Sequence, residues 1–452
     1  MNILSVDFGT SSMKMEIFTD RLESLAATKV AYDLIITNHD WIELSPEQLW
    51  AAFRQGLEEL RDYRESIALI TYDTLSPSLV FMDREGRALT NIITHLDRRA
   101  KKQSRDILEK MDKEHFQSIT GIYPFIGGCP LTTLLWVKEN RPDIFDAAYK
   151  VGHLPSYILK RLTGTWGIDF CNATMMGMYE TVTLKGWSEE ICGTFGVPMD
   201  KLLPVKDAGS VQGFLKEEEA RFLGLRPGIP VALGTNDCAI TQVGAGNMRA
   251  GCILDVSGSS EAFSVLSDVP KHDSHYYLRG AAQPGLWQIF SISSSGFSVE
   301  WCRQQFYRDV TEEEFFGNVM ERALAQEPGG TQVRFQPYLN GDRQSLEMKR
   351  GGFTQLTLDT TRDEMLAAIM NGVHEHILDT LHICEQIMPR MNREIVWCGG
   401  LMTEAIKRYK ERLLPQYTFV QKENCALRGN VILALKQLPP ELRLPTWNYC
   451  KM

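Results

Sequence analysis

A run of small, hydroxyl-bearing residues follows the first apolar segment of the chain, and these residue types suit the binding of phosphate. Residues 4–18 read LSVDFGTSSMKMEIF, so the turn Gly9-Thr10-Ser11-Ser12 lies between two predicted strands. Backbone N–H groups and hydroxyls in such a turn donate to phosphate oxygens, and glycine lets a ligand approach the main chain closely. The stretch has no G-x-x-x-x-G-K-S/T pattern and no helical pattern follows at once, so it is not a P-loop.

Two charged residues flank this turn. Asp7 ends the first strand, where a carboxylate beside phosphates would repel them unless a cation lay between, so we expect Asp7 to hold Mg²⁺ through water. The alternative is an aspartate that only caps its own turn. Lys14 either reaches a phosphate oxygen or is a solvated strand residue, and the sequence favours neither interpretation.

A second aspartate lies where a buried strand gives way to a helix. Residues 229–246 read IPVALGTNDCAITQVGAG, so Asp237 stands at a strand end and a helix start, where the helix dipole keeps it ionised. This placement suits a general base that accepts the proton of an alcohol attacking a phosphorus atom. Read alone, the motif is better explained as a helix N-cap.

The segment THLDRRA, residues 94–100, gathers His95, Asp97, Arg98 and Arg99 at the end of a strand. Charge-assisted hydrogen bonds from such a cluster can orient the hydroxyls of a polyol. The segment is equally consistent with an ion-pair cluster on the surface.

A strand, Gly399-Gly400 and a helix make up the segment IVWCGGLMTEA, which includes Thr403. Two glycines at this place could admit an adenosine against the backbone, although the pattern is weak by itself.

The first turn recurs in the second half of the chain. Residues 252–268 read CILDVSGSSEAFSVLSD, in which Gly258-Ser259-Ser260 separates two apolar strands. Two such turns, one beginning each half, predict a duplicated unit and a polyphosphate held between two domains that face a shared cleft.

Strands and helices alternate along the chain, which favours an α/β fold. The predicted strands are Val30–Ile36, Ile67–Tyr72, Ile229–Leu233 and Ile395–Cys398, and the predicted helices are Pro46–Tyr63, Leu131–Glu139, Tyr157–Leu162, Thr361–Ile387 and Thr403–Leu414.

The composition excludes several classes of protein. A length of 452 residues predicts two domains or three, and a net charge of −9 argues against nucleic acid as a partner. No stretch approaches about 18 apolar residues, so no membrane span is expected. Ten cysteines without a C-x-x-C pair indicate reduced thiols in a cytoplasmic protein. His374, His376 and His382 lack the spacing of a zinc site, and we expect no structural metal.

Taken together, these motifs resemble the FGGY carbohydrate kinases of the actin-like, sugar-kinase ATPase superfamily, from one end of the chain to the other. The two phosphate loops of that family resemble Asp7-Phe8-Gly9-Thr10-Ser11-Ser12 and Val256-Ser257-Gly258-Ser259-Ser260. Asp97-Arg98-Arg99 is similar to the Asp-x-Arg of the sugar site, and Asp237 to the aspartate of the G-x-x-D motif. Further similar segments are FQPYLNGDR (335–343) with GGFTQL (351–356), and, on the adenosine side, GGLMTEA (399–405) with ALRGNVILAL (426–435).

The resemblance implies two duplicated ribonuclease H-like domains, at residues 1–243 and 244–452, with a cleft between them. It also implies phosphorylation of a sugar or polyol hydroxyl by ATP with Mg²⁺, with Asp237 as the base. The expected sugar-binding residues are Asp97, Arg99, His95 and Asp73. The expected ATP-binding residues are Gly9, Thr10, Ser11, Ser12, Lys14, Gly258, Ser259, Ser260, Gly399, Gly400 and Thr403. A homodimer is expected only by analogy.

Departures from the family pattern fall on the sugar side. Thr133 replaces a lysine, a residue near Leu75 replaces a glutamine, His95 replaces an aromatic residue, and Gln355 replaces a glycine. We therefore transfer no particular sugar from xylulose, ribulose, gluconate or glycerol kinases. Two alternatives stay open: a sugar-responsive regulator that has lost turnover, and an actin-like ATPase that acts on a protein partner.

Overall fold

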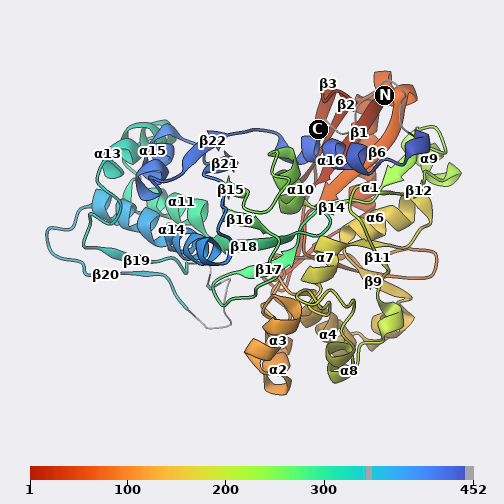
Figure 1. Ribbon diagram of the computed structural model, residues 1–452, viewed down its shortest axis with the longest axis horizontal. Coiled ribbons are helices and arrows are strands. Elements are labelled where there is room, and N and C mark those ends of the chain that lie inside the picture. Colours follow the sequence, from red (N-terminus) through yellow and green to blue (C-terminus); the bar gives the residue numbers. More distant parts are fainter. Residues whose placement is uncertain (340, 343–348, 443–452) are drawn as a thin grey trace. The chain divides into compact units, whose positions relative to one another are not determined.

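The computed structural model describes residues 1–339, 341–342 and 349–442. The chain forms two compact units, each with its own sheet (Figure 1). Unit 1 comprises Met1–Met248, Leu278–Leu286 and the described residues from Asn424 on, and unit 2 comprises the described residues of Arg249–Tyr277 and Trp287–Glu423. The chain first passes from unit 1 to unit 2 between Met248 and Arg249 and returns to unit 1 twice, and the domain boundary expected at 243/244 stays a prediction. Within the FQPYLNGDR motif, Asn340 and Arg343 lie outside the described residues.

The main sheet of unit 1 has the order β12-β13-β6-β1-β2-β3, with β14 paired to β6. Strand β1 is antiparallel to β2 and parallel to β6, and it is buried almost throughout, as its apolar sequence predicts. The strands are β1 (Asn2–Phe8), β2 (Ser12–Thr19), β3 (Ser24–Ala31), β6 (Ile67–Thr74), β12 (Val211–Phe214), β13 (Pro230–Ala232) and β14 (Thr235–Asn236).

A smaller sheet of unit 1 has the order β4-β5-β8-β7-β9, and β10 pairs with β11. These strands are β4 (Ile35–Thr37), β5 (Trp41–Leu44), β7 (Ser78–Met82), β8 (Ile92–Thr94), β9 (Lys150–Gly152), β10 (Ile168–Asp169) and β11 (Val205–Lys206). The helices of unit 1 are α1 (Pro46–Glu59), α2 (Lys101–Lys110), α3 (Lys113–Thr120), α4 (Pro130–Asn140), α5 (Pro142–Ala147), α6 (Leu154–Thr163), α7 (Phe170–Met175), α8 (Glu189–Phe195), α9 (Glu217–Leu223), α10 (Asp237–Gly244) and α16 (Cys425–Gln437), with short 3-10 helices at Arg61–Ser66, Met199–Lys201 and Pro440–Leu442.

Helix α16 comes from the end of the described chain but packs beside α10 and against the central strands β1 and β6 of unit 1 (Figure 1). Its apolar residues Val431, Ala434 and Leu435 are fully buried in a cluster with Ile3 and Leu69. Burial of this apolar face explains why the last segment belongs to the first unit.

The main sheet of unit 2 includes the order β18-β16-β15-β21-β22. Strand β17 (Tyr277–Gly280) spans the boundary between the units. The other elements are β15 (Ile253–Ser257), β16 (Glu261–Ser267), β18 (Trp287–Ser293), β19 (Arg334–Gln336), β20 (Gly352–Thr354), β21 (Glu394–Cys398), β22 (Thr418–Gln421), α11 (Ser295–Phe306), α12 (Glu312–Glu314), a π-helical turn at Phe315–Val319, α13 (Met320–Ala323), α14 (Arg362–Ile387) and α15 (Glu404–Leu413).

The predicted duplication is confirmed in the strand topology. In unit 1, β1 pairs antiparallel with β2, β2 pairs antiparallel with β3, and β1 pairs parallel with β6. In unit 2, β15, β16 and β18 repeat the antiparallel series, and β15 pairs parallel with β21. Both glycine-hydroxyl turns therefore join the first and second strands of their sheets.

Most of the predicted elements are present, and one strand prediction was wrong. Helix α14 begins behind Thr361, which forms a capping box with Glu364, so the helix expected at Thr361–Ile387 is confirmed. The strand expected at Val30–Ile36 is instead divided between β3, which ends at Ala31, and β4, which begins at Ile35 and pairs with β5 in the smaller sheet. In the described part of the chain, no helix is both long and apolar enough to cross a membrane.

Candidate functional site

Parallel strands of unit 1 bring three aspartates to one edge of the sheet. Asp7 of β1 is the register partner of Asp73 in β6, and Asp73 is in turn paired with Thr235 of β14. Asp237 follows two residues later, at the start of α10. The carboxyl ends of parallel strands are where α/β sheets place ligands, so this edge is the natural position for a site.

Asp237 is more exposed to solvent than Asp7 or Asp73. Its residue is exposed, whereas Asp73 is fully buried. Desolvation by the surrounding protein, followed by the negative charge of Asp7, raises the pKa of Asp237 to about 6. An accessible carboxylate with a raised pKa is suited to accept a proton near neutral pH.

Local hydrogen bonds hold the Asp237 carboxylate in place and show whether it is the N-cap of the helix. The N-cap of α10 is Asn236, whose side chain accepts from the Ala239 N–H (3.0 Å). The simpler interpretation of Asp237 as the helix N-cap is therefore wrong. Its Oδ1 instead accepts from the Cys238 N–H (2.7 Å) and the Asn236 side-chain amide (2.8 Å), which leaves the other oxygen, Oδ2, for a ligand.

Asp73, which is expected among the sugar-binding residues, lies beside Asp7 in the sheet. Its Oδ1 accepts a hydrogen bond from the side-chain amide of Asn430 in α16, which also donates to the Ser5 hydroxyl (3.2 Å). Its Oδ2 is buried without a hydrogen-bond partner in the described chain. Burial and the charge of Asp7 raise the pKa of Asp73 well above its usual range. Sequence reasoning missed Asn430, although a lone asparagine in the apolar run ALRGNVILAL was the available signal.

The first turn has its backbone fixed and its hydroxyls near the surface. The Gly9 N–H donates to the Ser12 carbonyl (3.1 Å), and the Tyr32 hydroxyl donates to the Gly9 carbonyl (2.5 Å). Ser11 is exposed, and Gly9, Thr10 and Ser12 are half-buried. Tyr32 was not among the predicted site residues.

Lys14 lies beside Asp7 and remains accessible. Its ammonium nitrogen is 3.4 Å from the Asp7 Oδ2, and its side chain is 53% exposed. Burial raises the pKa of Asp7, and the charge of Lys14 opposes that rise. Because the Lys14 side chain is exposed, its pairing with Asp7 contributes little to stability, and its ammonium group is available to a charged ligand.

The second turn is fixed in a similar way within unit 2. The Gly258 N–H donates to the Ser260 carbonyl (3.0 Å), and the Phe297 N–H of α11 donates to the Ser259 carbonyl (2.8 Å). Gly296 packs so closely that a Cβ there would lie 2.3 Å from the Gly258 carbonyl oxygen. Ser259 is exposed, so this turn also presents a hydroxyl to solvent.

Local structure explains two of the three residues expected near an adenosine. Gly399 has a φ of +116°, and a Cβ there would lie 2.2 Å from the Ser257 carbonyl oxygen, so strand packing requires glycine. The Thr403 hydroxyl accepts from the Ile406 N–H (3.3 Å) as the N-cap of α15. Gly400 has open space where a side chain would be, and it stays a candidate for close approach of a ligand.

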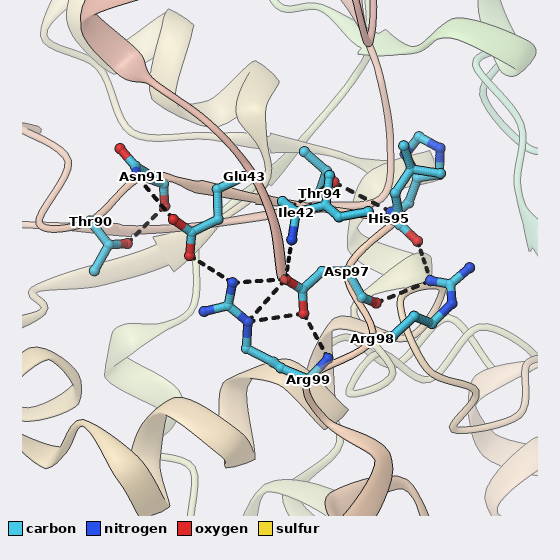
Figure 2. A network of polar contacts seen from close by, with 10 residues as sticks. Ile42, Glu43, Thr90, Asn91, Thr94, His95, Asp97, Arg98 and Arg99 are labelled. Atoms are coloured by element: carbon cyan, nitrogen blue, oxygen red, sulfur yellow. Dashed lines mark hydrogen bonds and ion pairs between the residues drawn. The ribbon is translucent and has the colours of Figure 1, made fainter. Parts of the chain in front are cut away.

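Asp97 and Arg99 form a buried ion pair, not the surface cluster that the sequence left as an alternative (Figure 2). Their side chains are 1% and 5% exposed. The Asp97 carboxylate accepts from the backbone N–H of Ile42 (2.8 Å) and from Arg99, whose Nη2 also lies 2.6 Å from Glu43 Oε1. The Arg99 guanidinium packs over the ring of Trp41, with its carbon 4.5 Å from the ring centroid.

The residues of the segment 94–99 have different structural roles. Asp97 and Arg99 hold each other and strand β5, so most of their polar groups are already occupied. Arg98 donates to the carbonyls of His95 (2.8 Å) and Asp97 (3.0 Å), which fixes the loop. The His95 imidazole points away from the ion pair in Figure 2. Glu43 was missed, because nothing in its own neighbourhood in the sequence links it to residue 99.

Two of the departures from the family pattern have visible local geometry. Thr133 is buried in α4. Gln355 follows β20 with a φ of 63°, the left-handed region that favours glycine. The backbone at residue 355 therefore keeps the conformation that a glycine would adopt most easily.

The residues near Asp7 fit a divalent cation, although the arrangement is incomplete. Among the described residues, no group of three or more His, Cys, Asp or Glu side chains is placed to hold a metal ion. Asp7 is partly accessible, and a buried oxygen of Asp73 lacks a partner nearby in the sheet. A cation reached through water would relieve the repulsion among these carboxylates, which suits the coordination that Mg²⁺ prefers.

Comparisons with known proteins show which family the chain belongs to. Residues 2–244 match the family model described as the FGGY family of carbohydrate kinases, N-terminal domain. A gluconokinase from Bacillus licheniformis is 25% identical over 388 residues, which cover 82% of this chain and 74% of that protein. A xylulose kinase from Lactococcus lactis subsp. lactis is 25% identical over 409 residues, covering 88% and 80%. A crystal structure of gluconate kinase from Lactobacillus acidophilus has a TM-score of 0.87 at 23% identity, covering 97% of this chain and 89% of that one.

The fold is the two-domain fold of the actin-like ATPases. Within that class, the family match extends over more than half of the chain. The protein belongs to the FGGY family of carbohydrate kinases and is an enzyme of that class.

Proposed function

We propose that this protein transfers the terminal phosphoryl group of ATP to a hydroxyl of a sugar or polyol, with Asp237 as the general base. The observation that carries the proposal is the accessible Asp237 carboxylate, with its raised pKa, at the sheet edge that also bears Asp7 and the first turn. A positioned base of this kind contributes roughly 10²–10⁴-fold to rate.

Each glycine-hydroxyl turn is proposed to bind phosphate oxygens. The first would use Gly9, Thr10, Ser11 and Ser12, and the second would use Gly258, Ser259 and Ser260. Support comes from their matching places between the first and second strands of the two sheets and from their exposed serines. Because phosphoryl transfer needs charge stabilisation more than covalent chemistry, fixed backbone donors are what a protein must supply.

Mg²⁺ is proposed to bind near Asp7, through water, where it would neutralise charge on the phosphates. Lys14 is proposed to add a positive charge to the same region, since its ammonium group is exposed and only 3.4 Å from Asp7. On the adenosine side, Gly400 is the residue that the geometry favours, and Gly399 and Thr403 would support it by shaping the backbone.

The sugar is proposed to bind at the segment 94–99. The buried ion pair of Asp97 and Arg99 would hold the loop in place. The His95 imidazole, which points away from that pair, would contact a hydroxyl of the sugar. Relatives named gluconokinase and xylulose kinase make gluconate and xylulose the first substrates to test.

The test is ADP release from ATP with a panel of ketoses, aldoses, polyols and sugar acids. Sugar-dependent ADP release is expected. ADP release that is independent of sugar would support the partner-directed ATPase, and sugar binding without ADP release would support the regulator. Asp237→Asn should keep nucleotide binding and lower kcat by at least about tenfold, because the base is lost. Asp200→Asn, at an exposed residue of the same unit, is the matched control. Unchanged turnover in Asp237→Asn would remove Asp237 from its role.

A further inference from the structure

A buried lysine in unit 2 joins the two strands that carry the second turn. Lys410 of α15 is 1% exposed. Its ammonium nitrogen lies 2.5 Å from Asp255 Oδ2 in β15 and 2.8 Å from the Ser257 hydroxyl, and it also contacts Glu261 Oε1 in β16. Asp255 and Ser257 precede the turn Gly258-Ser259-Ser260, and Glu261 follows it directly.

Side chains of two further elements, α14 and β21, belong to the same network. The Nε2 atom of His374 in α14 lies 3.2 Å from Glu261 Oε2, and its Nδ1 lies 2.6 Å from the Met370 carbonyl oxygen. The indole N–H of Trp397 in β21 donates to the Ser257 hydroxyl (2.7 Å). Side chains from five elements of the same unit therefore converge on the base of one turn.

Charge balance in this network depends on Lys410. Burial raises the pKa of Asp255 to about 6, and the charge of Lys410 opposes that rise. Burial alone would raise the pKa of Glu261 as well, but the charges of His374 and Lys410 hold it well below its usual range. Without Lys410, the buried Asp255 carboxylate would have no cationic partner and Glu261 would keep only His374, both beside a turn proposed to bind phosphate.

A buried ion network of this kind is a weak source of stability, because the desolvation of its charges offsets most of their attraction. It is an effective means of fixing geometry, since it ties the strands on both sides of the turn to one side chain. Donors that are already in place when a ligand arrives avoid the cost of ordering them on binding.

We propose that Lys410 is a positioning residue that holds the second turn in the conformation that binds the phosphates of the nucleotide. The inference rests on the proposed function only in taking that turn as a phosphate-binding element. Lys410 acts through Asp255 and Glu261 and does not touch the ligand itself.

The test compares Lys410→Met with Lys407→Met, a control on the same helix whose side chain is half-exposed. ADP binding is measured by isothermal titration calorimetry, and KM is measured separately for ATP and for the sugar. In Lys410→Met we expect the Kd for ADP and the KM for ATP to rise by about tenfold or more, with the sugar KM within about twofold of the parent value. Lys407→Met should match the parent in all three.

A second variant keeps the test decisive if Lys410→Met does not fold. The triple variant Lys410→Met/Asp255→Asn/Glu261→Gln removes the unpaired charges and should fold, but it should still bind ADP about tenfold more weakly, because the neutral side chains no longer tie the strands together. A folded variant with ADP affinity within about twofold of the parent would overturn the proposal, even if its melting temperature fell. A parent protein that binds ADP but phosphorylates no sugar would refute the proposed function and leave this inference standing. A parent that binds no ADP would overturn both.

Discussion

Asn430 offers a direct test of how the buried carboxylate of Asp73 is held. Its side-chain amide donates to Asp73 Oδ1 (2.5 Å) and to the Ser5 hydroxyl (3.2 Å), and Asn430 is 1% exposed. Asn430→Leu keeps a similar volume and removes both hydrogen bonds. A bond to a charged group is worth about 1.5–3 kcal/mol and a neutral one about 1 kcal/mol, so the free energy of unfolding should fall by about 2.5–4 kcal/mol.

The size of that loss should depend on pH. Burial and the charge of Asp7 raise the pKa of Asp73, and Asn430 opposes the rise, so removing Asn430 raises the folded-state pKa further. A carboxyl with a higher pKa in the folded state binds more protons there, and stability then falls as the pH rises toward that value. The destabilisation by Asn430→Leu should therefore be larger at about pH 8 than at about pH 5.

Urea unfolding of the parent, Asn430→Leu and the control Gln437→Leu measures this effect. Gln437 is a half-buried residue at the end of the same helix, so its substitution should change the unfolding free energy by less than about 0.5 kcal/mol. An Asn430→Leu variant that loses less than about 1 kcal/mol, or the same amount at both pH values, would refute the role of Asn430 in holding the Asp73 carboxylate.

Two further predictions concern Asp237 and Gln355. The kcat/KM for the sugar should fall as the pH drops through about 6, because Asp237 must be ionised to accept a proton, and a flat profile would contradict this. Asp7→Asn should move that inflection to lower pH, since the charge of Asp7 helps to raise the pKa. Gln355→Gly should raise the melting temperature, with a net gain of about 0.5–1 kcal/mol from relief of the left-handed backbone, whereas Thr354→Gly, within β20, should lower it. A lower melting temperature for Gln355→Gly would exclude backbone strain at that residue.

The sequence was sufficient for features that depend on neighbours along the chain. Apolar strands on both sides of Gly9-Thr10-Ser11-Ser12 predicted a turn between two strands, and the same pattern at Gly258-Ser259-Ser260 predicted the duplication. The capped helix behind Thr361 was equally readable, because a capping box lies within four residues. Such features follow from local backbone preferences and side-chain periodicity.

Only the tertiary structure decided which distant residues meet. Strand register placed Asp73 beside Asp7, and packing of α16 brought Asn430 to Asp73 across 357 positions of sequence. The partnership of Arg99 with Glu43 and that of Lys410 with Asp255 and Glu261 arise in the same way. A buried charge needs a partner of opposite charge, because removing it from water is costly. The two partners interact strongly only where water is excluded, and that environment forms only once the sheets and helices have packed.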